Sequence, residues 1–218
     1  MYIISLIISG SRIGFSMNPM TAFSPSSGGL EILGGTGTIP IDGFGRWWTL
    51  LSANYLHASL LHIFFNMLMF WQLAPLASRE YGSYRMFSIY TIGGVIGFLV
   101  SYLARIPFTI GASAAVCALV GSLLYFGKSR GGVYGQAVYK QIFGWVISLF
   151  LFGFFIPGIN NWAHGGGSLG GILVGWLLGY TEIRQERAYH KTIALVCAGL
   201  TVIVLLWAVF SAFLIVLK

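Results

Sequence analysis

The sequence predicts an all-α protein that crosses a membrane several times. Of its 218 residues, 57% are hydrophobic and only 8% are charged, whereas a soluble domain carries about 25% charged residues. The apolar residues also gather in runs of about 20, the length of helix that crosses the hydrocarbon core. Because backbone groups in lipid must bond within their own segment, such runs are expected to be helices.

Seven apolar runs are expected to span the membrane. The run at the N-terminus has no basic segment before it, which argues against a signal peptide. The segment 21–56 is too rich in Gly, Ser and Pro to span, so we expect it to be an outer-side loop with Trp47 and Trp48 at the interface. The predicted spans lie near residues 2–20, 57–77, 84–104, 113–127, 137–157, 161–180 and 192–216.

The basic residues indicate how the chain is oriented. Most of the Lys and Arg residues fall in three loops on one side of the predicted spans: Arg79, Arg85, Lys128, Arg130, Lys140, Arg184, Arg187 and Lys191. The positive-inside rule places these loops in the cytoplasm. We therefore expect a multi-pass protein of the bacterial inner (cytoplasmic) membrane. The net charge of +7 is scattered rather than clustered, which gives no support for nucleic-acid binding.

Three groups of polar residues interrupt the apolar runs, and such residues usually mark function. The first group holds His57, His62 and Asn66. His62 and Asn66 are four residues apart and project from one face of one helix. They could equally be polar side chains that satisfy each other inside a bundle.

The second group surrounds Ser113, which opens the short run after Gly111. A Ser at a helix start is often only an N-cap, or a packing residue inside the membrane. The G-x-S pattern is weak alone, and a hydrolase elbow would have Gly at its fifth position, where this chain has Ala115.

The third group begins with Asn161 and His164. Four glycines follow His164 at intervals of four, Gly167, Gly171, Gly175 and Gly179, and form a smooth stripe that favours close helix packing. The run that begins at Ser113 offers small residues at the same interval. A Ser–His hydrogen bond requires heavy atoms about 2.6–3.2 Å apart, which short side chains on two helices reach only when the backbones nearly touch.

All three groups fall at the outer ends of their runs, which predicts one shared site. The acidic residues all lie in loops, namely Glu31, Asp42, Glu80, Glu182 and Glu186, so no carboxylate is expected to orient His164. The pattern therefore favours a Ser-His dyad over a Ser-His-Asp triad. It also excludes a paired-aspartate site and an H-E-x-x-H zinc site. Cys117 and Cys197 lie in apolar runs and show no metal spacing, so no metal is expected.

Together these motifs resemble the rhomboid family of intramembrane serine proteases from about Trp47 to Gly175. The resemblance rests on H-x-x-x-x-H-x-x-x-N at His57, His62 and Asn66, on G-x-S at Gly111 and Ser113, and on A-H-x-x-G-x-x-x-G from Ala163. It implies a six-helix catalytic core in residues 1–180, with a linker and an extra C-terminal transmembrane helix in residues 181–218.

The resemblance also implies residue roles. Ser113 would be the nucleophile, His164 the general base, and Asn66, His62 and the Ser113 N–H the oxyanion donors, with Gly111, His57 and Asn161 in support and Gly167 and Gly171 in helix packing. Substrates would be transmembrane proteins, reached from the extracytoplasmic side, and no cofactor is implied.

The chain departs from the family pattern at three positions. Ala114 stands where many members have Gly, Cys117 where relatives often have an aromatic residue, and Thr49 where Arg often follows Trp.

Three other functions are compatible with a polytopic membrane protein. A rhomboid-like protein without activity could bind membrane clients, although such relatives usually lose the Ser or the His. A transporter usually shows inverted repeats or broken helices, which this sequence lacks. A metal or haem site would have to use the histidines alone.

Overall fold

The structure is a computed structural model that describes residues 1–14, 22–156 and 158–216. These residues form helices, with two isolated β-bridges and no sheet among them, so the prediction of an all-α protein is confirmed. Within the described ranges, four helices are long and apolar enough to cross a membrane: α5 (Leu60–Tyr81), α6 (Ser83–Leu103), α8 (Gly132–Phe155) and α10 (Ala188–Val216). The chain is a multi-pass membrane protein.

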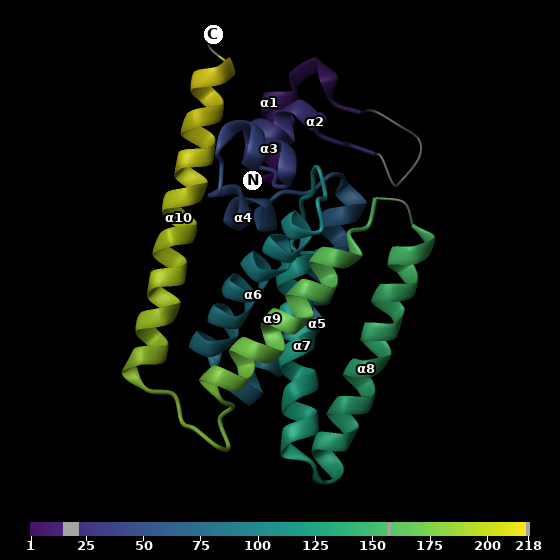
Figure 1. Ribbon diagram of the computed structural model, residues 1–218, viewed down its shortest axis with the longest axis vertical. Coiled ribbons are helices and arrows are strands. Elements are labelled where there is room, and N and C mark those ends of the chain that lie inside the picture. Colours follow the sequence, from purple (N-terminus) through teal and green to yellow (C-terminus); the bar gives the residue numbers. More distant parts are fainter. Residues whose placement is uncertain (15–21, 157, 217–218) are drawn as a thin grey trace.

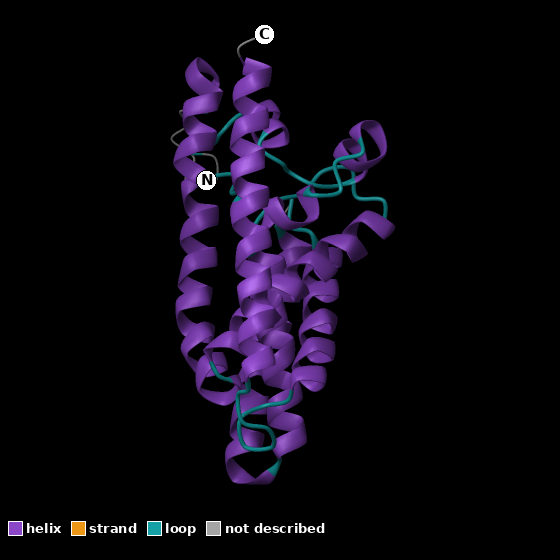
Figure 2. Cartoon of the chain, turned by 90° about the vertical axis from the view of Figure 1, so that its left-hand side faces the viewer, coloured by secondary structure: helices purple, strands orange, loops and turns teal. Residues whose placement is uncertain are grey.

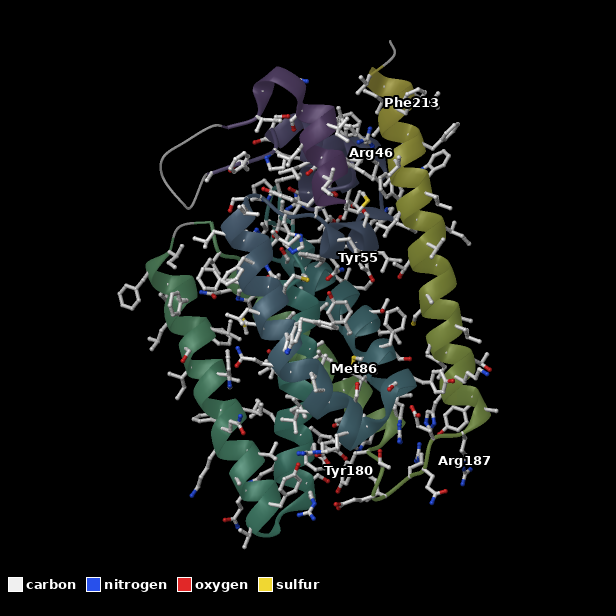
Figure 3. The ribbon with its side chains drawn as sticks, turned by 180° about the vertical axis from the view of Figure 1, so that it is seen from behind. Arg46, Tyr55, Met86, Tyr180, Arg187 and Phe213 are labelled. Carbon is white, nitrogen blue, oxygen red and sulfur yellow. The ribbon has the colours of Figure 1, made fainter. Side chains whose placement is uncertain are left out.

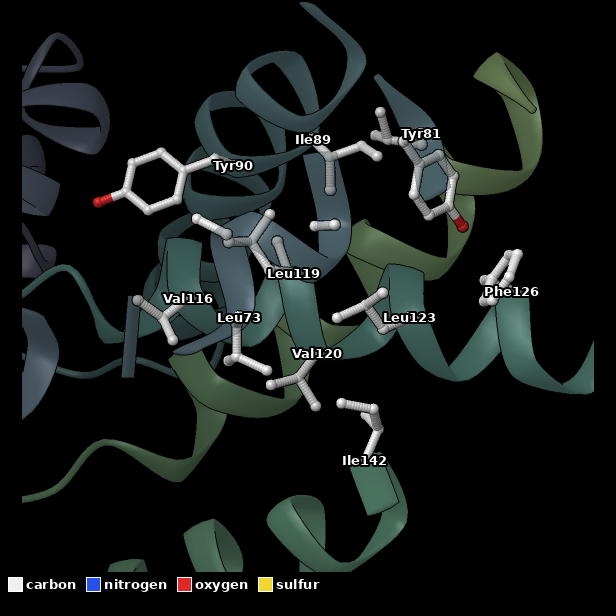
Figure 4. Close-up of a cluster of buried hydrophobic side chains, with 14 of the residues drawn as sticks. Leu73, Tyr81, Ile89, Tyr90, Val116, Leu119, Val120, Leu123, Phe126 and Ile142 are labelled. Atoms are coloured by element: carbon white, nitrogen blue, oxygen red, sulfur yellow. The ribbon is translucent and has the colours of Figure 1, made fainter. Parts of the chain in front are cut away.

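Two further helices of 18 residues, α7 (Ser113–Arg130) and α9 (Asn161–Leu178), lie among these four (Figure 1). The residues of α7 from 114 to 123 are all buried, because α5, α6, α8 and α9 pack around it. Leu119 and Leu123 of α7 meet Leu73 of α5 and Ile89 of α6 in the main hydrophobic cluster (Figure 4). Helix α7 is therefore surrounded mainly by other parts of the protein rather than by lipid.

The segment expected to be an outer loop is folded into short helices at one end of the molecule (Figure 2). They are α2 (Ser27–Ile32), α3 (Thr38–Phe44), α4 (Thr49–Ser52) and the 3-10 turn η2 (Ala53–Tyr55). Thr36 pairs with Thr109 through backbone hydrogen bonds of 3.0 and 2.7 Å. This pairing joins the segment to the chain that leads into α7.

The prediction of one spanning helix over residues 2–20 is wrong. The helix α1 (Tyr2–Ser9) has eight residues and continues only as the 3-10 turn η1 (Gly10–Arg12); residues 15–20 lie outside the described part. Eight residues rise about 12 Å, well short of the hydrocarbon core of about 30 Å. The helix ends at Gly10, whose φ of 53° leaves the helical region. The hydroxyl of Ser9 then accepts a bond of 2.8 Å from the Ser26 N–H, which fixes α1 to the start of α2.

The connections between α5 and α6, between α7 and α8, and between α9 and α10 lie at the opposite end of the molecule (Figure 1). The connection from α9 to α10, with Tyr180 and Arg187, is seen at this end in Figure 3. The guanidinium of Arg85, which is fully buried, donates to the carbonyl oxygens of Gly179 and Arg184 at 2.7 and 2.6 Å. The carboxylate of Glu186 in turn accepts a hydrogen bond from the backbone N–H of Arg85 at 3.3 Å. These bonds attach the connection to the first turn of α6.

Candidate active site

Ser113 is the first residue of α7 and is partly exposed. The N-cap of this helix is Ala112, and no side chain caps it. Ser113 therefore does not serve as the N-cap, which was the alternative explanation for a serine at this position. The first N–H groups of a helix have no partner within it and stabilise negative charge. The hydroxyl of Ser113 thus lies beside a local source of positive potential.

Gly111 allows the approach to Ser113. Its φ of +125° is a conformation that residues with a side chain rarely adopt, and its N–H donates to the Ala53 carbonyl at 2.9 Å. A Cβ at this position would lie 2.8 Å from His62 Nε2 and 3.7 Å from Ser113 Oγ. The imidazole of His62 and the hydroxyl of Ser113 therefore flank the same glycine.

His62 is oriented by the chain just before α5. The N-cap Ser59 accepts from the His62 N–H at 3.2 Å, and the Nδ1 atom of His62 accepts from the Ala58 N–H at 3.2 Å. A neutral imidazole that accepts at Nδ1 carries its proton on Nε2. The Nε2–H group of His62 is therefore a donor directed at Gly111 and the start of α7.

Asn66 lies one turn further along α5 and is buried. Its Nδ2 atom donates to the His62 carbonyl at 2.9 Å, which leaves the second N–H of the amide for another acceptor. His62 and Asn66 are thus arranged on one face of α5, as their spacing predicts.

His57 is buried, and its ring meets the His62 ring edge to face, with centroids 5.2 Å apart. Burial, followed by the nearby His62 and the amino terminus, lowers the pKa of His57 to about 3, so the ring is neutral at physiological pH. It borders a mostly apolar cavity of about 360 Å³ between α5 and α6. The His57 ring therefore packs on the His62 ring and lines the cavity together with Ala112.

His164 lies in the first turn of α9 and is buried. Its backbone N–H donates to the Asn160 carbonyl at 3.1 Å. Its Nδ1 atom is buried and makes no hydrogen bond to any part of the chain that the structure describes. Among the described residues, no carboxylate bonds the His164 ring. The acidic side chains with a described partner bond elsewhere: Asp42 to Arg105, Glu80 to Arg79, Glu182 to Arg130 and Glu186 to the start of α6.

The glycine stripe of α9 packs directly on α7. A Cβ on Gly167 would overlap the carbonyl oxygen of Ala114, and a Cβ on Gly171 would overlap that of Ala118. No side chain can therefore separate the two backbones along this line. This close approach is the packing that stripes of small residues permit in membranes.

The register between α7 and α9 relates Ser113 to His164. The two helices run in the same direction (Figure 1), and Gly167 lies against Ala114 as Gly171 lies against Ala118. Ser113 comes directly before Ala114, and His164 lies about one helical turn before Gly167. The two residues are therefore level with each other at the starts of adjacent, closely packed helices.

The asparagines at the start of α9 have different surroundings. The amide of Asn161 faces α8, where a Cβ on Gly153 would overlap its Oδ1 atom. Asn160 is instead the N-cap, and its Oδ1 atom accepts from the Ala163 N–H at 3.1 Å. The sequence motif predicts a role for Asn161 and not for Asn160, although the strong preference of Asn for N-cap positions is a signal that could identify Asn160.

Two of the departures from the family pattern have a structural explanation. The Ala114 methyl is accommodated by α6, where its Cβ atom lies 3.0 Å from the position that a Cβ on Gly97 would take. Thr49 is buried and donates to the Arg46 carbonyl at 2.6 Å, and its hydroxyl bonds that of Thr36 at 3.0 Å. These bonds anchor the outer segment without an arginine at position 49.

The fold and the motifs agree with a family assignment. Residues 45–181 match the family model described as the Rhomboid domain, which covers more than half of the chain. The chain belongs to the rhomboid family.

Individual relatives lead to the same family. The chain is 33% identical over 135 residues to the rhomboid protease GluP of Bacillus subtilis (strain 168), a match that covers 62% of this chain and 27% of GluP. It is 32% identical over 163 residues to RHOMBOID-like protein 4 of Arabidopsis thaliana, covering 74% of this chain and 41% of that protein. The chain thus spans less than half the length of these two relatives.

Proposed function

We propose that the protein is an intramembrane serine protease that hydrolyses peptide bonds in or near the transmembrane segments of other membrane proteins. The observation that carries this proposal is the register of α7 and α9, which brings Ser113 level with His164 while the His62 Nε2–H faces the same helix start. Membership of the rhomboid family supports it, because relatives such as GluP are named rhomboid proteases.

The proposed reaction uses a dyad. His164 removes the proton of the Ser113 hydroxyl as Oγ attacks the carbonyl carbon of the scissile bond. The resulting oxyanion accepts hydrogen bonds from the Ser113 N–H, His62 Nε2 and Asn66 Nδ2, and each such donor is worth on the order of 10²-fold in rate. The intermediate collapses to an acyl-enzyme as His164 protonates the leaving amine. Water, deprotonated by His164, then releases the new carboxylate and restores Ser113.

The same proposal covers the placement of the chain in its membrane. Residues 1–180 form the catalytic core, and residues 181–218 form the linker and the additional C-terminal helix α10. The basic loops face the cytoplasm, and Ser113 opens to the extracytoplasmic side of a bacterial inner membrane. Substrates come from the lipid bilayer as transmembrane helices, and catalysis by the dyad uses no cofactor.

Two assays on the purified full chain test the proposal. A fluorophosphonate probe should label the protein, and the protein should cut one or more single-span membrane proteins in detergent. Both the probe labelling and the substrate cleavage should be lost in Ser113→Ala and in His164→Ala, whereas the melting temperature should stay unchanged. Cleavage that persists in Ser113→Ala would overturn the proposal. Stable binding of the single-span proteins without any cleavage or labelling would favour a client-binding protein instead.

A further inference from the structure

The side chain of Asn160 joins three segments of the chain. Its Oδ1 atom caps α9 through the Ala163 N–H. Its Nδ2 atom donates to Ser101 Oγ at 2.6 Å and to Thr109 Oγ1 at 3.1 Å. The amide oxygen and both N–H groups are thus engaged, which is more than an N-cap requires.

The segments that meet at Asn160 carry the groups of the proposed site. Asn160 lies four residues before His164, and its backbone carbonyl accepts a hydrogen bond from the backbone N–H of His164. Thr109 lies four residues before Ser113 and is held in turn by its backbone pairing with Thr36. Ser101 is fully buried in the last turn of α6, the helix that packs against both α7 and α9.

We propose that Asn160 is a positioning residue that fixes the start of α9 relative to the segment leading into α7, and so fixes His164 relative to Ser113. This inference rests on the proposed protease function. The glycine stripe sets how closely the helices approach but leaves them free to slide along their common axis. The two bonds donated by Asn160 oppose that sliding, because Ser101 and Thr109 belong to other elements.

A small slide is enough to matter for a dyad. A Ser–His hydrogen bond forms only over about 2.6–3.2 Å, and a shift of about 1 Å can lower a rate by about 10²-fold. In the part of the chain that the structure describes, His164 has no carboxylate partner to orient its ring, so the position of the ring depends on the helix that bears it. Asn160 acts through His164 and does not itself touch the reacting atoms.

Variants can separate capping from positioning. Asn160→Ser keeps a good N-cap oxygen but is too short to donate to Ser101 and Thr109. The pair Ser101→Ala with Thr109→Val keeps Asn160 and removes both acceptors. A matched control, Thr192→Val with Ser211→Ala, removes two hydroxyls of α10 that bond only to carbonyls of their own helix.

Kinetic assays on the full chain provide the first readout. We expect Asn160→Ser to lower kcat and the rate of fluorophosphonate labelling by about 10-fold, with KM for a single-span substrate nearly unchanged. The Ser101→Ala, Thr109→Val pair should have a similar effect. Adding Asn160→Ser to this pair should cause little further loss, because contacting residues act together. The control should match the wild type.

A crosslinking assay provides a readout that does not need activity. In a background without Cys117 and Cys197, Ser113→Cys with His164→Cys should be crosslinked by a short bifunctional thiol reagent, because the register places both residues level at the starts of adjacent helices (Figure 1). Asn160→Ser should slow this crosslinking several-fold. Unchanged labelling, kcat and crosslinking in Asn160→Ser would overturn the positioning role. If the double-cysteine protein crosslinks in a way that depends on Asn160, but the wild type neither labels nor cleaves, the proposed function alone would be overturned.

Discussion

Gly111 is the single residue on which the site geometry depends most directly. Its positive φ is unfavourable for any residue with a side chain, by about 1–2 kcal/mol, and an added Cβ would lie 2.8 Å from His62 Nε2. We expect Gly111→Ala to displace the His62 ring and to lower kcat/KM by about 10²-fold, the effect of losing one oxyanion donor. Steady-state cleavage of a single-span substrate measures this.

The control for Gly111→Ala is Gly131→Ala. Gly131 also has a positive φ, of 64°, but nothing lies within 4 Å of an added Cβ, and it sits at the far end of α7. This variant should carry a similar backbone strain and still cleave at the normal rate. Equal activity losses in the two variants would mean that strain, and not the displacement of His62, accounts for the effect.

At the residue scale, the sequence predicts some features of the candidate site and not others. The spacing of His62 and Asn66 predicts their common face, because helix geometry alone sets it. It does not reveal that the methyl of Ala114 fits against Gly97, or that the side chain of Asn160 bonds Ser101 and Thr109. Those facts depend on which neighbour each side chain meets, and neighbours from distant segments leave no local pattern.

At the scale of elements, the packing of α9 on α7 yields a prediction. Gly167→Ala should push the two helices apart, because the new methyl would overlap the Ala114 carbonyl, and a backbone atom cannot rotate away. We expect cleavage to fall by at least about 10-fold, with overpacking that destabilises the protein by about 1–3 kcal/mol. Activity at a temperature well below melting, together with the melting temperature, measures both effects.

Gly165→Ala tests the same helix at a position without that constraint. Its added methyl would lie 3.7 Å from the Phe150 ring of α8, an ordinary contact distance. The variant should fold and cleave like the wild type. Normal turnover by Gly167→Ala would show that the two backbones do not need to approach so closely.

Arg85 attaches the connection that leads into α10 to the start of α6. Its buried guanidinium bonds the carbonyls of Gly179 and Arg184, and bonds to charged groups are worth about 1.5–3 kcal/mol each. Arg85→Ala should therefore loosen residues 181–187, seen as faster limited proteolysis there and a lower melting temperature. Arg79→Ala is the control, since the Arg79 side chain is largely exposed and its ion pair contributes little. Equal protease resistance in all three proteins would contradict this role.

Elements were predicted unevenly from the sequence. The helices α5, α6, α8 and α10 lie close to the predicted spans because hydropathy reports directly on lipid exposure. The short α1 was not foreseen, since a run of apolar residues does not reveal where Gly10 will turn the chain. The folded structure of residues 22–56 was also not predicted, because its bonds, such as Thr36 to Thr109, join residues far apart in the sequence.

At the scale of the whole molecule, the proposed orientation is open to test in intact cells. In a background without Cys117 and Cys197, Gly43→Cys in α3 and Gln185→Cys in the α9–α10 connection place exposed thiols at opposite ends. A membrane-impermeant thiol reagent should label the first in intact cells, and the second only after the cytoplasmic membrane is permeabilised. The reverse pattern would place Ser113 on the cytoplasmic side.

The burial of α7 has a consequence for the shape in which a substrate arrives. Every residue from 114 to 123 is buried in the protein, and at this end of the helix Ser113 is partly exposed. An intact helix lying alongside α7 would find no reactive group there. Under the proposed protease function, a substrate would have to pass over the Ser113 end of α7 as unwound backbone. Substrate selection should then depend more on how easily a substrate helix unwinds than on the side chains that it exposes to lipid.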